Sequence, residues 1–437
     1  MSGVEAGFWS LGGLFLLIAL RVPIGVALGG IALVGITVLR NEAVALAVLK
    51  RTPFEFAAHY TLSAIPMFLL MGAVAHHSGI SAALFKAARL WLSGLPGGLA
   101  VSTNMACAGF AAASGSSIAT AAAMGKLAVP EMLRAGYDKG LATGVVASAG
   151  TLGSMIPPSI MFVLFGIFAE VSIVDLLIAG ILPGLLTAGV YTVMIMLRCQ
   201  LNPSLAPKLD PAELARLKPE RWRALGQVWP LIVLMLGIIG GLYSGVVTPT
   251  EAGAAGAALA YLIAILQGRM TWARFRESLL DAMSSTARIF FIAAGAVMFT
   301  KFLAISGMPT YLGNNLADLG SPILLIIATS VIFVVLGMFL DPLGLMLLTL
   351  PVLLPMFEGQ GMSLVWFGVL TVKFLEIGLL TPPVGFNVYV IKGAVGDTVS
   401  LEAIFKGVTW FLVCEAIVVV LLVAFPEIAL FLPETMK

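Results

Sequence analysis

Long apolar runs follow one another along almost the whole chain, and they constrain the fold more than any other feature. The first run, residues 8–39, is longer than the roughly 20 residues that one membrane crossing needs. Because Arg21-Val22-Pro23 interrupts this run, we expect two helices there. Further apolar runs lie at 61–75, 97–130, 140–168, 174–197, 228–243, 251–266, 287–305, 321–355, 364–391 and 408–432. The pattern predicts an all-α polytopic membrane protein with about 11 transmembrane helices, a multi-pass protein whose surroundings are the lipid bilayer.

The charge content supports this class and excludes others. Only 11% of the 437 residues are charged, whereas a soluble chain carries about 25%. The net charge of +2 and the scattered basic residues exclude a nucleic-acid partner. Cys107, Cys199 and Cys414 lie too far apart for a disulfide framework or a zinc site. No paired aspartates, HExxH motif or Ser-His set supports an intramembrane enzyme, so we expect no enzymatic activity.

One polar stretch divides the chain. Residues 198–227 contain six basic residues and four prolines, which favours a cytoplasmic loop by the positive-inside rule. We therefore expect a first half at 1–200, a cytoplasmic linker at 201–227 and a second half at 228–437. After a second basic stretch, Trp272, Phe275, Leu279 and Met283 recur at helical spacing, which predicts a scaffold helix lying along the membrane interface.

The two halves repeat a pattern of helix breakers. A shift of 225 positions places five glycines and prolines of the first half on the same residue types in the second half. The matched pairs are Pro130 with Pro355, Gly136 with Gly361, Gly153 with Gly378, Pro157 with Pro382 and Pro158 with Pro383. An internal repeat whose matched residues break helices is typical of secondary transporters.

Each half has a Pro-Pro pair inside an apolar run, at 153–159 (GSMIPPS) and at 378–384 (GLLTPPV). Proline removes an amide donor and glycine permits unusual backbone angles, so the helix should open there and free its carbonyls. An unpaired carbonyl is costly in hydrocarbon and survives only beside protein, water or a bound cation. A simple proline kink is the alternative at each position. Two kinks at matched positions favour broken helices, at about 140–168 and 364–391.

Two further runs, 97–130 and 321–355, pass a polar cluster midway. We expect each to form a re-entrant hairpin of two half-length helices. At the tips, Asp341 followed by proline reads as a helix N-cap, and Ser116 or Ser117 could cap the other return helix. The amides exposed at such helix starts attract anions, which makes Ser116 and Asp341 candidate substrate contacts.

Four segments resemble the large (M, or DctM-like) membrane subunit of the TRAP transporters, the tripartite ATP-independent periplasmic transporters. They are GSSIAT at 115–120, TPTEA at 248–252, DPL at 341–343 and EIGLLTPPVG at 376–385. The resemblance covers almost the whole chain. It implies an elevator fold in the bacterial inner membrane and Na⁺-coupled symport of an organic acid, a small-molecule carboxylate. It also implies two partners: a periplasmic substrate-binding protein that delivers the acid, and a small four-helix membrane subunit on a separate chain.

The same resemblance implies two sodium sites. The first would use the hydroxyls of Ser114 and Ser117 with backbone oxygens at Gly153, Ile156 and Pro157. In this hairpin the Ser-Gly-Ser-Ser register leaves Ser114 and Ser116 as alternatives.

The second site would use Gly337 of the second hairpin with Gly378, Thr381 and Val384 at the second break. Because hydroxyls lie in the hairpin of the first half but in the break of the second, we expect the two sites to differ in affinity.

Other polar residues in apolar runs are open to more than one interpretation. Lys373 and Glu376 lie three positions apart and could neutralise each other. Asn387 could bind substrate or hold a freed carbonyl, and Glu251 is expected to cap a helix. A channel and a stand-alone divalent-anion/Na⁺ symporter are the alternatives to the hypothesis of a TRAP transporter subunit. Uptake of free substrate without a binding protein would favour the symporter.

Overall fold

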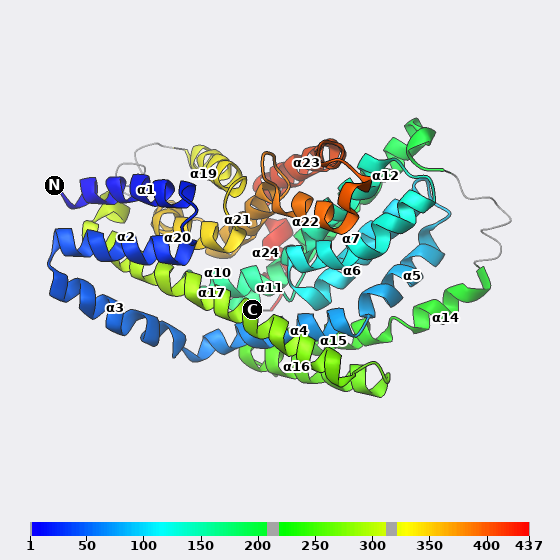
Figure 1. The fold of residues 1–437 in the computed structure, drawn as a ribbon, viewed down its shortest axis with the longest axis horizontal. Helices are drawn as coiled ribbons and strands as arrows, with labels where there is room; N and C mark the ends of the chain where they lie inside the picture. Colours follow the sequence, from blue (N-terminus) through cyan, green and yellow to red (C-terminus); the bar gives the residue numbers. More distant parts are fainter. Residues whose placement is uncertain (1, 208–217, 312–320, 437) are drawn as a thin grey trace.

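The computed structural model describes residues 2–207, 218–311 and 321–436. Every regular element in these ranges is a helix, as the apolar runs predict (Figure 1). Part of the expected cytoplasmic linker, 208–217, lies outside the described residues.

The first apolar run forms two helices, α1 (Gly3–Ala19) and α2 (Ile24–Leu39). Arg21 takes a left-handed backbone conformation with φ +63°, and the amide of Val22 donates to the carbonyl of Leu17 at 3.0 Å. This is the closing hydrogen bond of a Schellman motif, which ends a helix. The predicted division at Arg21-Val22-Pro23 is therefore confirmed.

One side of the molecule is formed by a group of helices in which α17 lies beside both α2 and α4, and α4 lies beside α16 (Figure 1). A Cβ atom added at Gly295 of α17 would lie 2.3 Å from the carbonyl oxygen of Gly25 in α2. The two backbones therefore touch. The helices of this side are α3 (Glu42–Ala57), η1 (Tyr60–Ser63), α4 (Ala64–His77), α5 (Ile80–Leu92), α14 (Arg221–Gly226), α15 (Trp229–Tyr243), α16 (Pro249–Leu266) and α17 (Trp272–Ser306).

Helix α17 differs from the prediction. The residues expected to form a separate interfacial helix are the first turns of one continuous helix of 35 residues, long and apolar enough to cross a membrane. The polar residues after Met283 lie within this helix and do not end it. One of them, Thr286, donates its hydroxyl proton back to the carbonyl of Ala282 at 2.7 Å.

Helix α16 begins as its sequence predicts. Thr248 and Glu251 form a reciprocal capping box, in which the Thr248 amide donates to the Glu251 carboxylate at 2.8 Å. The expected capping role of Glu251 is thus confirmed.

The first half continues with a helical hairpin and a broken helix. The hairpin is α6 (Gly98–Ser114) and α7 (Ser117–Arg134), close to the expected 97–130. The broken helix bends by 43° between Lys139–Met155 and Ile160–Phe168. The remaining helices of this half are α8 (Lys139–Gly150), α9 (Leu152–Met155), α10 (Ile160–Phe168), α11 (Ile173–Ala179), α12 (Ile181–Leu201) and η2 (Pro203–Leu205).

The second half also contains a helical hairpin and a broken helix, and its helices pack against helices of the first half. Helix α23 lies against α8, and α22 lies against both α7 and α8. The helices not yet named are η3 (Lys218–Glu220) of the linker, α19 (Pro322–Gly337), α20 (Pro342–Gly359), α21 (Leu364–Gly378), α22 (Phe386–Val395), η4 (Gly396–Thr398), α23 (Leu401–Ala424) and α24 (Glu427–Glu434).

Among the described residues, five helices are long and apolar enough to cross a membrane, and counting each bent pair as one span raises the number to seven. Four further apolar helices are shorter. The molecule is thus a bundle of apolar helices, and the expected count of about 11 crossings remains a prediction.

Candidate functional site

The tip of the first hairpin is a tight turn of two residues. Gly115 ends α6 with φ +63°, a conformation that glycine adopts without strain. Ser116 then caps α7, its hydroxyl accepting from the amide of Ala119 at 3.4 Å. Of the two serines considered for this role, Ser116 is therefore the cap, and Ser117 is the first residue of the helix.

This tip lies directly on the first broken helix. A Cβ atom added at Gly115 would lie 2.5 Å from the carbonyl oxygen of Pro158, and the amide of Ile160 donates to the Gly115 carbonyl at 3.2 Å. A Cβ atom added at Gly153 would lie 2.5 Å from the carbonyl oxygen of Ser116. Glycine at both positions lets the two backbones approach this closely.

Hydroxyl groups gather where the tip meets the break. The Ser114 hydroxyl lies 2.6 Å from that of Thr120, and the Ser117 hydroxyl lies 2.7 Å from that of Ser154. Both Ser114 and Ser117 are buried. The structure therefore places Ser114, rather than the capping Ser116, with its hydroxyl inside the protein.

The remaining predicted oxygen donors of this site lie in the break itself. Ile156 leaves helical geometry with ψ 126°, and Pro157 follows it in the unwound segment. The segment ends at Ser159, whose hydroxyl caps α10 by accepting from the amide of Phe162 at 3.3 Å.

A carboxylate from the second half, that of Glu376, is hydrogen-bonded to this cluster of hydroxyl groups. The Ser117 hydroxyl donates to Oε2 of Glu376 in α21 at 2.7 Å. Because a hydroxyl carries one proton, Ser154 is then the donor in its hydrogen bond with Ser117. Oε1 of Glu376 is buried and has no hydrogen-bond partner among the described residues.

The second hairpin and the second break also touch. A Cβ atom added at Gly378 would lie 2.8 Å from Cα of Gly337 and 3.0 Å from its carbonyl carbon. Two of the predicted donors of the second site are therefore adjacent. Thr381 and Val384 lie in the unwound segment that follows α21, and the Thr381 hydroxyl donates to the carbonyl of Ile377 at 2.7 Å.

The three candidate substrate residues lie on separate elements. Asp341 caps α20 as predicted, accepting from the amide of Gly344 at 2.9 Å, and Ser116 caps α7. Asn387 is fully buried in α22 and donates to the carbonyl of Ala147 at 3.1 Å. Its own Oδ1 has no partner among the described residues. Asn387 thus holds a carbonyl, one of its two proposed roles, and among the described residues no hydrogen bond joins it to either cap.

The expected pairing of Lys373 with Glu376 is wrong. The Lys373 ammonium instead forms a salt bridge with Glu415 of α23 at 2.5 Å and donates to the Thr187 hydroxyl at 2.9 Å. Glu415 also accepts from the phenol of Tyr191 in α12. All four side chains are buried.

These partners were missed because only local spacing guided the sequence interpretation. Thr187, Tyr191 and Glu415 lie far from Lys373 in sequence. The available signal was a glutamate in the middle of the apolar run 408–432, since an acid in such a run needs a partner.

The first cluster has the chemistry that a small monovalent cation needs. It offers hydroxyl, carbonyl and carboxylate oxygens, and its buried Oε1 lacks a partner. A sodium ion fits this set, because hard cations prefer oxygen ligands. Among the described residues there is no group of three or more His, Cys, Asp and Glu side chains that could hold a metal ion.

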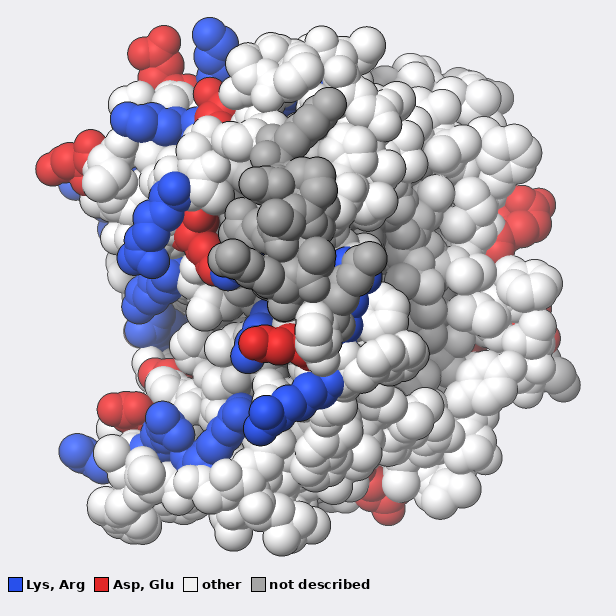
Figure 2. All heavy atoms as spheres, turned by 90° about the vertical axis from the view of Figure 1, so that its right-hand side faces the viewer, with Lys and Arg blue, Asp and Glu red and all other residues white. Residues whose placement is uncertain are grey.

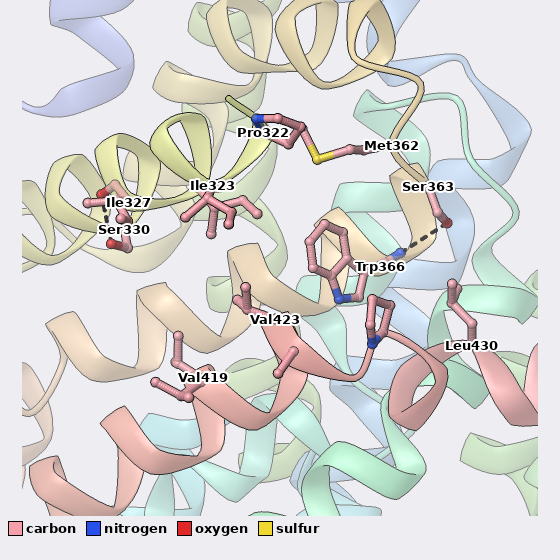
Figure 3. A pocket seen from close by; sticks show the side chains of 14 residues that line it. Pro322, Ile323, Ile327, Ser330, Met362, Ser363, Trp366, Val419, Val423 and Leu430 are labelled. Carbon is pink, nitrogen blue, oxygen red and sulfur yellow. Dashed lines mark hydrogen bonds between the residues drawn. The ribbon is translucent and has the colours of Figure 1, made fainter. Parts of the chain in front are cut away.

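Two cavities lie away from these tips. The first, of about 680 Å³, is lined by apolar residues of α19, α21, α23 and α24 (Figure 3). The Trp366 indole in its wall donates a hydrogen bond to the Leu422 carbonyl and so is not free for a ligand. The lining residues with a hydroxyl group are Ser330 and Ser363. Such walls offer little to a carboxylate. The second, of about 950 Å³, contains Lys301, which contacts Glu55.

Comparison with known proteins identifies the family. Residues 11–428 match the family described as "Tripartite ATP-independent periplasmic transporter, DctM component". The chain is 34% identical to the C4-dicarboxylate TRAP transporter large permease protein DctM of Pseudomonas aeruginosa, over 87% of this chain and 88% of that protein. It is 31% identical to the sialic acid TRAP transporter large permease protein SiaM of Vibrio cholerae, over 86% and 87% of the two chains.

A third relative is longer than this chain. The isethionate TRAP transporter permease protein DctMQ of Oleidesulfovibrio alaskensis is 32% identical over 87% of this chain, which spans 59% of that relative. Among solved structures, the YdaH transporter of Alcanivorax borkumensis shares the fold with a TM-score of 0.60 and 14% identity, over 89% of this chain and 90% of that one. The chain therefore belongs to the DctM family, the large permease component of the TRAP transporters.

Proposed function

We propose that this protein takes up an organic acid by sodium symport across the bacterial inner membrane. The acid is received from a periplasmic binding protein. The relatives are named for C4-dicarboxylate, sialic acid and isethionate, which supports an organic acid as the substrate class. Transport by a permease, rather than catalysis, is what these names share.

The observation that carries the proposal is the close backbone contact between each hairpin and a broken helix. In the first half Gly115 and Ser116 lie against Pro158 and Gly153, and in the second half Gly337 lies against Gly378. Each contact joins a hairpin to a broken helix at or next to the place where helices end. Such places bind ions inside membrane transporters.

The helix bounds support an internal repeat. Helices α7 and α20 begin at Ser117 and Pro342, and α8 and α21 begin at Lys139 and Leu364. Each pair is 225 positions apart, the shift that also aligns the glycines and prolines.

An elevator movement is supported by how the halves are joined. The hydrogen bonds Ser117–Glu376 and Asn387–Ala147 cross between the halves, so the hairpins and breaks pack as one body. The group of α2, α4, α16 and α17 lies to one side of it (Figure 1). We propose that this body carries the acid and sodium while the outer group stays fixed.

The distribution of basic residues supports placing the end of the molecule with α12 and α14 on the cytoplasmic side of the membrane. Figure 2 views the end of the molecule that carries α12 and α14, and lysine and arginine side chains gather along one side of it. Arg221 there lies over the Trp91 ring, 5.9 Å from its centroid. Tryptophan is typical of membrane interfaces, and an excess of lysine and arginine is typical of the cytoplasmic side.

We also propose a separate small membrane subunit as partner. The longer DctMQ relative contains a segment that this chain does not match.

The energetics allow uphill transport. Two sodium ions entering down a tenfold gradient supply about 2.8 kcal/mol, since each decade is worth about 1.4 kcal/mol. One net charge moving through 100 mV adds about 2.3 kcal/mol. The sum of about 5 kcal/mol could concentrate a monoanionic acid more than a thousandfold.

The test is uptake by proteoliposomes that contain this chain and its small subunit. We expect uptake only with an inward sodium gradient and a loaded binding protein, and none when choline replaces sodium. Equal uptake of free acid without the binding protein would favour the stand-alone symporter. Uptake that ignores sodium would contradict the proposal.

A further inference from the structure

Among the described residues, one lysine and two glutamates are buried in the core of the molecule, so one acid has no basic counterpart. Lys373, Glu376 and Glu415 are each at most 1% exposed. The Lys373 ammonium pairs with Glu415 at 2.5 Å, and no salt bridge is formed by Glu376 within the described part of the chain. One carboxylate is thus left without a cation of its own.

Burying an uncompensated charge is expensive, so such a group normally has a partner. Helix α21 places Lys373 one turn from Glu376, but the ammonium is directed to α23 and α12, where Glu415 and Thr187 bind it. Polar hydrogen bonds satisfy only Oε2 of Glu376, through Ser117. Its Oε1 is buried and unpartnered among the described residues.

From this geometry we propose that Glu376 is the anionic ligand of the cation at the first hairpin. Oε1 would bind the sodium ion and Oε2 would hold the Ser117 hydroxyl in place. The inference rests on the proposed function for the identity of the ion. A buried carboxyl without an ion pair is neutralised by a proton or by a cation, and the buried, unpartnered Oε1 offers a cation its ligand.

The position of Glu376 also links the two proposed sites. It lies two residues before Gly378 on the same helix, and Gly378 contacts Gly337 of the second hairpin. A cation held by Glu376 would therefore fix the end of α21 on which the second site depends. We expect sodium binding at the two sites to be cooperative for this reason.

The test compares Glu376→Gln with wild type in thermal unfolding of the purified protein, at one pH, in sodium and in choline buffer. Glutamine keeps the shape and an acceptor for Ser117 but removes the charge. In choline we expect the variant to be at least as stable as wild type, because the unpaired charge is gone. Replacing choline by sodium should raise the thermal stability of wild type more than that of the variant. The sodium concentration that gives half of this stabilisation should be at least about tenfold higher for the variant.

Glu402→Gln, on an exposed first turn of α23, is the matched control and should behave as wild type. A Glu376→Gln protein with unchanged sodium dependence would overturn the inference, as would one that is less stable than wild type in choline or fails to fold there. Wild type that gains nothing from sodium over choline would instead contradict the proposed function.

Discussion

The contact between Gly337 and Gly378 leads to a sharp prediction for Gly378→Ala. The new Cβ would lie 2.8 Å from Cα of Gly337 and 3.0 Å from its carbonyl carbon, whereas ordinary contacts begin at 3.4 Å. Both obstacles are backbone atoms, so no side chain can turn away. The second hairpin must move from α21 by about 0.6 Å or more.

Overpacking of this kind costs about 1–3 kcal/mol of stability. It would also separate two of the proposed sodium donors, and misplacement on this scale can reduce function about a hundredfold. We therefore expect Gly378→Ala to lower the melting temperature and to nearly abolish sodium-driven uptake in proteoliposomes.

Gly393→Ala is the matched control, because Gly393 lies within α22 and an added Cβ meets nothing within 4 Å. Alanine there should leave uptake unchanged and stabilise the helix by up to about 1 kcal/mol. The reasoning is refuted if Gly378→Ala matches Gly393→Ala in both melting temperature and uptake.

Three further predictions concern single side chains. Lys373→Met should destabilise the protein by about 3–5 kcal/mol in thermal unfolding, because Glu415 is left buried and unpaired; a Lys373→Met/Glu415→Gln double variant that recovers nothing would refute this. Thr248→Ala should cost about 1 kcal/mol by removing the cap of α16, without changing the sodium dependence of uptake; altered sodium dependence would refute it. Ser117→Ala should raise the sodium concentration for half-maximal uptake while the protein stays folded, and an unchanged value would count against Ser117 as a ligand.

The parts of the fold governed by local chemistry could be predicted from the sequence. Arg21-Val22-Pro23 ends a helix through backbone conformation and a missing amide, and both effects act within a few residues. The caps Ser116 and Asp341 follow from the same kind of local rule. So do the unwound segments, where Pro-Pro removes consecutive donors.

The partners of buried charges could not be predicted in this way. Lys373 and Glu376 share a helix, and their spacing suggested a local pair. In the structure Lys373 forms a salt bridge with Glu415, and Glu376 accepts a hydrogen bond from Ser117. The packing of α21 against other helices decides which of these groups meet. The length of α17 also escaped prediction, since its polar residues after Met283 lie within the helix and do not end it.

The central claim is that the two helix breaks, each in contact with a hairpin, hold sodium ions. Equilibrium binding of radioactive sodium to the purified chain tests it most directly. The account predicts two sodium ions per chain, not displaced by potassium, and only one after Glu376→Gln at sodium concentrations that saturate a single site. Absence of saturable sodium binding to the folded wild-type protein would contradict it.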